Sequence, residues 1–201
     1  MLPEGYSPFS RPAGHYRKHG PFGYENYGSY RDWLRDEYLF RCCYCLVREQ
    51  WYGGSAVFHI DHVQSQRAEP SLTTTYDNLT YSCIQCNLAK RDKRIPDPAC
   101  LTSETVRLNE DGSFSGQTAD ATFLIDALVL NRASAKAYRL RIVALSDRAR
   151  RQPDRHSLEF FEFPAELPDL STMRPKGNHR PEGITMSWFE LRSQGQLPAF
   201  Y

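Results

Sequence analysis

The sequence predicts an α+β fold, in which a small core of strands and a helix is held together by cysteines and followed by a helical C-terminal extension. Three observations support this prediction. Two C-x-x-C pairs stand at residues 42–45 and 83–86, and an apolar, strand-like segment at 55–63 lies between them. Residues 119–151 carry apolar side chains near helical spacing, which predicts one or two helices.

The composition is that of an ordinary globular domain. Its 201 residues can bury a core, and the formal net charge of +1 excludes a strongly basic nucleic-acid coat but not a local basic groove. We find no apolar run long enough to cross a bilayer and no signal-peptide pattern, so we expect a cytoplasmic protein that does not enter membranes. In that compartment the six cysteines are better candidates for metal ligands or free thiols than for disulfides.

The chain divides into four segments. Residues 1–28 are rich in Gly, Pro and Tyr and read as an irregular arm, whereas residues 29–98 contain the predicted core. Residues 99–155 are predicted to form a hairpin with an Asp-Gly turn and a basic helical extension. The role of the tail, residues 156–201, is open: its aromatic residues either complete the protein's own core or dock on a protein partner.

The two C-x-x-C pairs predict a metal site. Each pair lets two thiolates of one tight turn reach the same ion, and two pairs complete the tetrahedral set of a structural zinc site. The expected zinc ligands are Cys42, Cys45, Cys83 and Cys86. The first pair taken alone could equally be a buried apolar group, and a thioredoxin-like redox pair is disfavoured because no βαβ pattern surrounds it. Cys43 could compete with Cys42 but has the poorer spacing, and Cys100 is most simply a buried or free thiol.

The segment "FHIDHV", between the two pairs, combines a strand pattern with reactive side chains. Its apolar residues indicate a buried strand, yet His59, Asp61 and His62 interrupt them. Burying such groups is costly unless they are paired, hydrogen-bonded or metal-bound. We therefore interpret this segment as a functional site.

The order of these motifs resembles the HNH endonuclease family, in its four-cysteine, zinc-containing branch. The matching elements "CCYC", "IDHV", "DNL" and "CIQCNLAK" follow one another in the expected order within residues 30–95. The resemblance implies a ββα-metal fold, in which a two-stranded hairpin packs on a helix with one catalytic metal between them. It assigns residues 29–98 to an HNH nuclease domain stapled by the zinc site.

The resemblance also implies the catalytic residues. Asp61 and Asn87 would hold a catalytic Mg²⁺ or Mn²⁺, which prefer oxygen ligands, and His59 is either a further ligand or a packing residue. His62 would be the general base, because a histidine can be neutral near pH 7 and take a proton from water. Asn78 would hold the loop between the strands and orient His62.

Basic residues after the second cysteine pair are candidates for contacts with nucleic-acid phosphates. They are Lys90, Arg91, Lys93 and Arg94. Such contacts position a backbone without reading its sequence. A second basic stretch, residues 132–151, could add to them or form the solvated face of a helix.

The sequence departs from the family pattern in one loop. Ser65 stands where many relatives carry proline, and the following residues lack their Gly-Gly, so the loop conformation is open. The resemblance further implies that Asp61 and His62 reach the same phosphate. Because neighbouring side chains of a strand point to opposite faces, we expect the backbone to leave regular strand geometry near them.

The sequence thus predicts a metal-dependent endonuclease that hydrolyses phosphodiester bonds in DNA and leaves 5′-phosphate and 3′-hydroxyl ends. Two alternatives stay open: a zinc-stapled nucleic-acid-binding or adaptor module with an idle catalytic centre, and an RNase or toxin of the same fold. One site per chain predicts nicking, so a double-strand break would need a homodimer or two successive cuts. Analogy with small HNH proteins points to a phage-related or host-defence setting.

Overall fold

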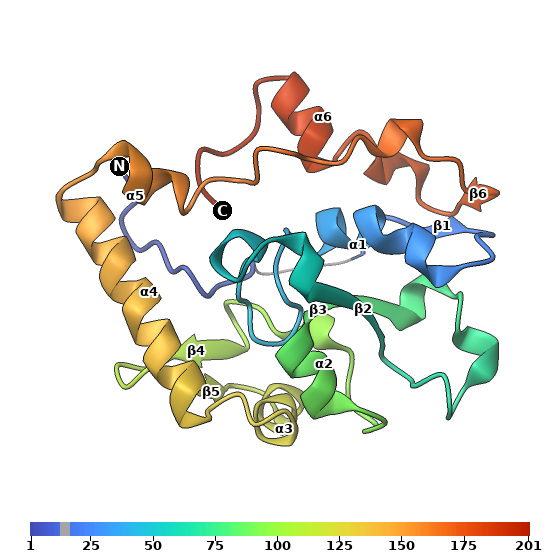
Figure 1. Cartoon of the computed structure of the whole chain (residues 1–201), viewed down its shortest axis with the longest axis horizontal. Helices are drawn as coiled ribbons and strands as arrows, with labels where there is room; N and C mark the ends of the chain where they lie inside the picture. The colour runs from blue at the N-terminus through green and yellow to red at the C-terminus, as the bar shows by residue number, and fades with distance from the viewer. Residues whose placement is uncertain (13–16) are drawn as a thin grey trace.

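The computed structural model describes residues 1–12 and 17–201 and has an α+β architecture of short helices and small sheets (Figure 1). Within these residues the helices are α1 (Arg31–Glu37), α2 (Ile84–Lys90), α3 (Ala119–Ala127), α4 (Ala133–Arg151), α5 (Arg155–Glu159) and α6 (Trp188–Ser193). The strands there pair antiparallel in twos: β2 (Phe58–His62) with β3 (Leu79–Cys83), β4 (Val106–Leu108) with β5 (Phe114–Gly116), and β1 (Pro21–Phe22) with β6 (Gly177–Asn178). The β2–β3 hairpin and α2 lie at the centre of the molecule.

The β2–β3 hairpin with α2 confirms the predicted core of two strands and a helix. Pairing runs without interruption from Phe58 opposite Cys83 to His62 opposite Leu79. The helix α2 begins directly after β3 and packs against both strands. The expected departure from strand geometry near Asp61 is wrong, because β3 is buried along its whole length and a buried strand holds its partner in one register.

The hairpin and helices predicted after residue 99 are also confirmed. A turn joins β4 to β5, and in it Gly112 has a φ of +78°, a left-handed conformation that favours glycine. A Cβ at this position would lie 2.5 Å from the carbonyl oxygen of Lys136 on α4. The long apolar and basic stretch forms two helices, α3 and α4. In the part of the chain that the structure describes, no helix is both long and apolar enough to cross a membrane.

The N-terminal arm is largely irregular, as predicted, but it packs into the core. The ring of Phe9 is buried with its centroid 5.3 Å from that of Trp51. The guanidinium of Arg11 is also buried and donates to the carbonyls of Pro98 at 3.1 Å and Cys43 at 2.9 Å. Residues 13–16 of the predicted arm lie outside the described residues.

The C-terminal tail folds back over the α1 side of the molecule (Figure 1). Its strand β6 pairs with β1 of the arm. Phe163 and Leu167 join Phe40 in a second hydrophobic cluster, and the indole of Trp188 donates to the carbonyl of Asp36 at 3.0 Å. Of the two roles considered for the tail, these contacts favour completion of the protein's own core.

Asp36, near the end of α1, joins the arm and the tail. Its buried carboxylate accepts hydrogen bonds from the Lys18 ammonium at 2.7 Å, from Nε2 of His19 at 2.7 Å and from the Trp188 N–H at 2.8 Å. Burial alone would raise the pKa of Asp36, but the His19 hydrogen bond and the Lys18 charge lower it below its usual 3.8. The ionised carboxylate therefore contributes stability above pH 3.8, and this contribution is lost as the pH falls through the lowered pKa.

We predict that Asp36→Asn lowers the free energy of unfolding by about 3–5 kcal/mol, because Lys18 loses its counter-charge and the carboxylate that His19 bonds is replaced by a neutral amide in a buried place. Urea denaturation near neutral pH measures this loss. Repeated in acid, it should show the wild type losing stability below pH 3.8 and the variant losing less.

Asp32→Asn is the matched control. Asp32 lies on the same helix and pairs with Arg35, but its side chain is 36% exposed. The substitution should change the free energy of unfolding by less than about 0.5 kcal/mol. Equal effects of the two substitutions would contradict the role given to Asp36.

Candidate active site and metal centre

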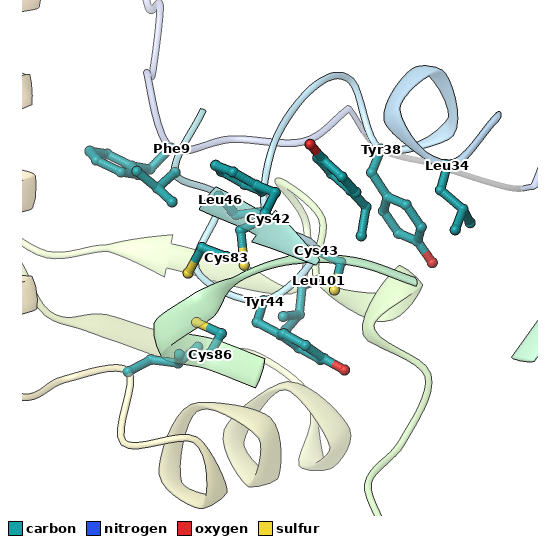
Figure 2. Packing of buried hydrophobic residues seen from close by; sticks show 14 of the residues in the cluster. Phe9, Leu34, Tyr38, Cys42, Cys43, Tyr44, Leu46, Cys83, Cys86 and Leu101 are labelled. Atoms are coloured by element: carbon teal, nitrogen blue, oxygen red, sulfur yellow. The ribbon is translucent and has the colours of Figure 1, made fainter. Parts of the chain in front are cut away.

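Four thiols gather where the two C-x-x-C pairs meet, as predicted. The sulfur atoms of Cys42, Cys45, Cys83 and Cys86 lie within 4.8 Å of one another, and those of Cys45 and Cys83 are 3.8 Å apart. A tetrahedral zinc ion with Zn–S bonds of about 2.3 Å gives sulfur–sulfur edges of about 3.8 Å. The cluster therefore fits a structural zinc site, and Figure 2 shows three of its sulfurs facing one another.

Local backbone structure brings these thiols together. Cys83 ends β3 and Cys86 lies in the first turn of α2, so one strand-to-helix junction presents both sulfurs. The first pair, residues 42–45, lies in a loop docked on the hairpin, because the Cys43 N–H donates to the carbonyl of Tyr81 on β3 at 2.8 Å. A metal in the cluster would join this loop to the beginning of α2.

The two remaining cysteines, Cys43 and Cys100, lie outside the cluster. The sulfur of Cys43 points away from the cluster (Figure 2), and burial raises its pKa well above the usual range. Burial also raises the pKa of Cys100, to about 11. Burial alone would raise the pKa of Cys42 too, but hydrogen bonds from neighbouring thiols lower it well below the usual range. Of the adjacent pair, only Cys42 has its sulfur in the cluster, so Cys42 is the residue suited to metal binding.

Asp61 lies near the end of β2 with its carboxylate almost fully buried. The Tyr44 hydroxyl donates to Oδ2 at 2.7 Å, while Oδ1 accepts from the His62 N–H at 2.8 Å and from the Lys90 ammonium at 3.3 Å. Burial raises the pKa of Asp61 above its usual value, and the Lys90 charge and the Tyr44 hydrogen bond oppose the rise. The result is a carboxylate held in one orientation, and its oxygens are of the kind that Mg²⁺ and Mn²⁺ prefer.

His62 ends β2, and its imidazole is held from two sides. Nε2 lies 2.9 Å from the carbonyl oxygen of Thr73, and the Tyr27 ring contacts the imidazole edge-on at 5.0 Å between centroids. Because a carbonyl only accepts, Nε2 carries the ring proton and Nδ1 keeps its lone pair. The amide nitrogen of Gln66, which is exposed, lies 3.4 Å from Nδ1. Burial lowers the pKa of His62 below its usual 6.5, which leaves the imidazole neutral near pH 7 and able to accept a proton.

Asn78 closes the loop between β2 and β3. Its Oδ1 accepts from the Gln64 N–H at 2.9 Å, and its Nδ2 donates to the carbonyls of Gln64 at 3.0 Å and Leu72 at 3.2 Å. These bonds hold both ends of the loop that carries Thr73, the anchor of His62. The loop that departs from the family pattern at Ser65 is thus tied down by a side chain rather than by glycine turns.

The two other proposed ligands are Asn87 on α2 and His59 on β2, the strand that also carries Asp61. Asn87 is half-buried in α2, three residues before Lys90, and residues three apart share a helix face. Asn87 therefore lies on the face that Lys90 turns toward Asp61. His59 is exposed, on the same side of β2 as Asp61.

Lys90 lies elsewhere than the sequence suggested. We expected it to contact a flanking phosphate, but its side chain is completely buried. Its ammonium pairs with Asp61 and donates to the carbonyl of His62. The helix α2 turns Lys90 inward because it packs against β2, and a buried carboxylate there offers the ammonium a partner.

The other predicted phosphate contacts are on the surface. The exposed basic residues after α2 are Arg91, Lys93 and Arg94. In the second basic stretch, which forms α4, Arg139 is buried instead. Its guanidinium lies 4.1 Å from the centroid of the Phe114 ring, and its Nε donates to the carbonyl of Gly112 at 2.6 Å. Arg139 therefore supports the β4–β5 hairpin.

Sequence reasoning missed the residues that hold Asp61 and His62. Tyr44 stands inside the first C-x-x-C pair. This position could have indicated a positioning role, since the side chain of a residue between two metal ligands points in a fixed direction. Thr73 acts through its backbone carbonyl, which no side-chain pattern can indicate. Tyr27 comes from the N-terminal arm, whose path depends on tertiary packing.

A comparison with protein families agrees with this geometry. Residues 42–93 match the family model described as HNH endonuclease, which takes in both C-x-x-C pairs, the β2–β3 hairpin and α2. No curated protein matches the chain. The chain therefore contains an HNH domain with a four-cysteine cluster compatible with zinc.

We predict that the purified protein holds one zinc ion per chain and that Cys83→Ser loses it. The variant should also be much less stable, because structural zinc contributes on the order of 10 kcal/mol in small metal-dependent domains. Elemental analysis and thermal unfolding measure the two effects. Cys100→Ser, outside the cluster, should keep its zinc. Full zinc content in the Cys83→Ser protein would refute the assignment.

Asn78→Ala should loosen the loop that carries Thr73. It removes three hydrogen bonds from a buried position, and we expect a loss of about 1–3 kcal/mol in the free energy of unfolding. Hydrogen exchange should be faster at the Gln64 N–H, which loses its partner. Unchanged protection at this amide would show that the loop does not depend on Asn78.

Proposed function

We propose that the HNH domain, whose family implies nuclease-type activity on nucleic acid, is a metal-dependent endonuclease that hydrolyses phosphodiester bonds in DNA. The observation that supports this most is the arrangement of two consecutive residues of β2. Asp61 is a buried carboxylate, and the imidazole of His62 has its Nε2 anchored on a carbonyl. Its Nδ1 carries a lone pair that can take a proton and that faces the amide of the exposed Gln66 at 3.4 Å. A module that only binds nucleic acid needs neither feature.

In the proposed reaction His62 is the general base. Nδ1 takes a proton from a water molecule, and the water oxygen forms a bond to phosphorus. The bond from phosphorus to the 3′ oxygen breaks, and its electron pair leaves with that oxygen, which takes a proton from solvent. The products carry 5′-phosphate and 3′-hydroxyl ends. A positioned base of this kind contributes about 10²–10⁴-fold in rate.

Asp61 and Asn87 are the residues proposed to hold a divalent cation, Mg²⁺ or Mn²⁺. Both offer side-chain oxygens, and both lie where β2 and α2 face each other. Such a cation, when bound, stabilises the charge that develops on the phosphate and on the leaving oxygen. Lys90 adds a fixed positive charge beside Asp61.

The surface after α2 supports a nucleic-acid substrate. Its exposed basic residues, Arg91, Lys93 and Arg94, suit the sequence-independent contacts that proteins make with phosphates. One catalytic centre in the HNH domain suggests that each chain makes a nick. A phage-related or host-defence role remains an analogy with small proteins of this family.

The test is cleavage of supercoiled plasmid DNA with Mg²⁺ or Mn²⁺. Wild-type protein should produce nicked circles, and His62→Ala should reduce the rate by about 10²–10⁴-fold because it removes the base. His156→Ala is the matched control, since His156 is an exposed histidine on α5 and should leave the rate unchanged.

Parallel reactions with single-stranded DNA and RNA separate the alternatives. Preference for RNA would replace the DNA substrate with the RNase alternative. Failure to cleave any of the three substrates would favour the binding module with an idle centre.

A further inference from the structure

A side chain inside the first C-x-x-C pair and another shortly after the second pair both donate to the carboxylate of Asp61. Tyr44 stands between Cys42 and Cys45, and its hydroxyl lies 2.7 Å from Oδ2. Lys90 lies one helical turn after Cys86 on α2, and its ammonium lies 3.3 Å from Oδ1. The loop that carries the first cysteine pair and the helix that carries Cys86 therefore each place one donor on the carboxylate of Asp61.

Both contacts are buried, so each of these polar groups needs its partner. The side chains of Tyr44 and Lys90 are at most 1% exposed, so water cannot replace either partner. A buried hydroxyl or carboxylate without a partner costs about 1–3 kcal/mol or more. The Tyr44 hydroxyl is thus committed to Asp61, and the direction of the carboxylate depends on it.

Counting acceptor positions shows which oxygen of Asp61 is available. A carboxylate has roughly four such positions, two on each oxygen. Oδ1 already receives the His62 N–H at 2.8 Å and the Lys90 ammonium. Oδ2 receives the Tyr44 hydroxyl alone among the described residues, so it keeps one lone pair.

We propose that Tyr44 is a positioning residue: its hydroxyl turns the remaining lone pair of Asp61 Oδ2 toward the divalent cation. The loop at residues 42–45 would then orient the carboxylate of Asp61 in addition to stabilising the fold through zinc. The proposal rests on the proposed function, because it concerns the same cation site.

The backbone around Tyr44 is suited to this role. The thiols on both sides of Tyr44 belong to the cluster, and the preceding N–H, of Cys43, is bonded to the carbonyl of Tyr81 on β3. The ring of Tyr44 points away from the sulfurs of Cys42, Cys83 and Cys86 (Figure 2), and its hydroxyl reaches the carboxylate of Asp61. A phenylalanine could fill the same space, so the hydroxyl is the part that acts on Asp61.

The experiment measures binding of Mn²⁺ by calorimetry and by electron paramagnetic resonance, without nucleic acid. Tyr44→Phe should raise the dissociation constant for Mn²⁺ by about 10–100-fold, as loss of a hydrogen bond to a metal ligand commonly does. Zinc content and melting temperature are recorded for each variant. Asp61→Asn gives the value for a site without its carboxylate.

Tyr138→Phe is the matched control. Tyr138 also has a partly buried hydroxyl, donates to the carbonyl of Trp51 at 2.9 Å and lines the same cavity as Cys45. The same atom is removed near the thiol cluster but away from Asp61. This variant should bind Mn²⁺ as the wild type does.

The outcomes separate the inference from the proposed function. If the wild type binds no Mn²⁺, the cation site of the proposed function fails, and the inference falls with it. If the wild type binds Mn²⁺ and zinc-loaded Tyr44→Phe binds it equally well, only the inference is overturned. Should Tyr44→Phe lose zinc, 4-fluorophenylalanine at this position fills the space of the hydroxyl without donating, and the same comparison of dissociation constants decides.

Discussion

The four-thiol cluster is the constraint on which the rest of this structure depends. The strands of the central hairpin have five residues each and α2 has seven, and such short elements are not stable alone in water. A zinc ion shared by the loop at residues 42–45 and the beginning of α2 would fix the helix against the hairpin. Because α2 is held there, Lys90 and Asn87 face β2, and Asp61 can stay buried with a counter-charge.

The candidate catalytic residues depend on supports drawn from several parts of the chain. Asp61 is held by Tyr44 from the first cysteine pair and by Lys90 from α2. His62 is held by a loop carbonyl whose position depends on Asn78, and Tyr27 of the N-terminal arm contacts its ring. Each reactive group is thus oriented by a neighbour that does no chemistry itself.

The segments outside the family match also stabilise this arrangement. The arm and the tail pair as β1 and β6, and both bond to the buried carboxylate of Asp36 on α1. A contact of α1 with β3 carries this support to the central hairpin. The family match at residues 42–93 therefore contains the candidate catalytic residues, while the flanking segments stabilise the domain that carries them.

The sequence by itself determined the elements of the core and the thiol cluster, because the spacing within each C-x-x-C pair and the alternation along "FHIDHV" are local properties that the chain keeps when it folds. It also placed Asp61 and His62 on one strand. Only the tertiary structure decided that Lys90 turns inward to Asp61 and that Arg139 is buried, since a basic residue on a helix can face solvent or core with the same local pattern. The supports of His62 were likewise decided by packing. Tyr27 is distant from His62 in the sequence, and Thr73 acts through its backbone carbonyl. Contacts of these two kinds leave no periodic signal in a single sequence.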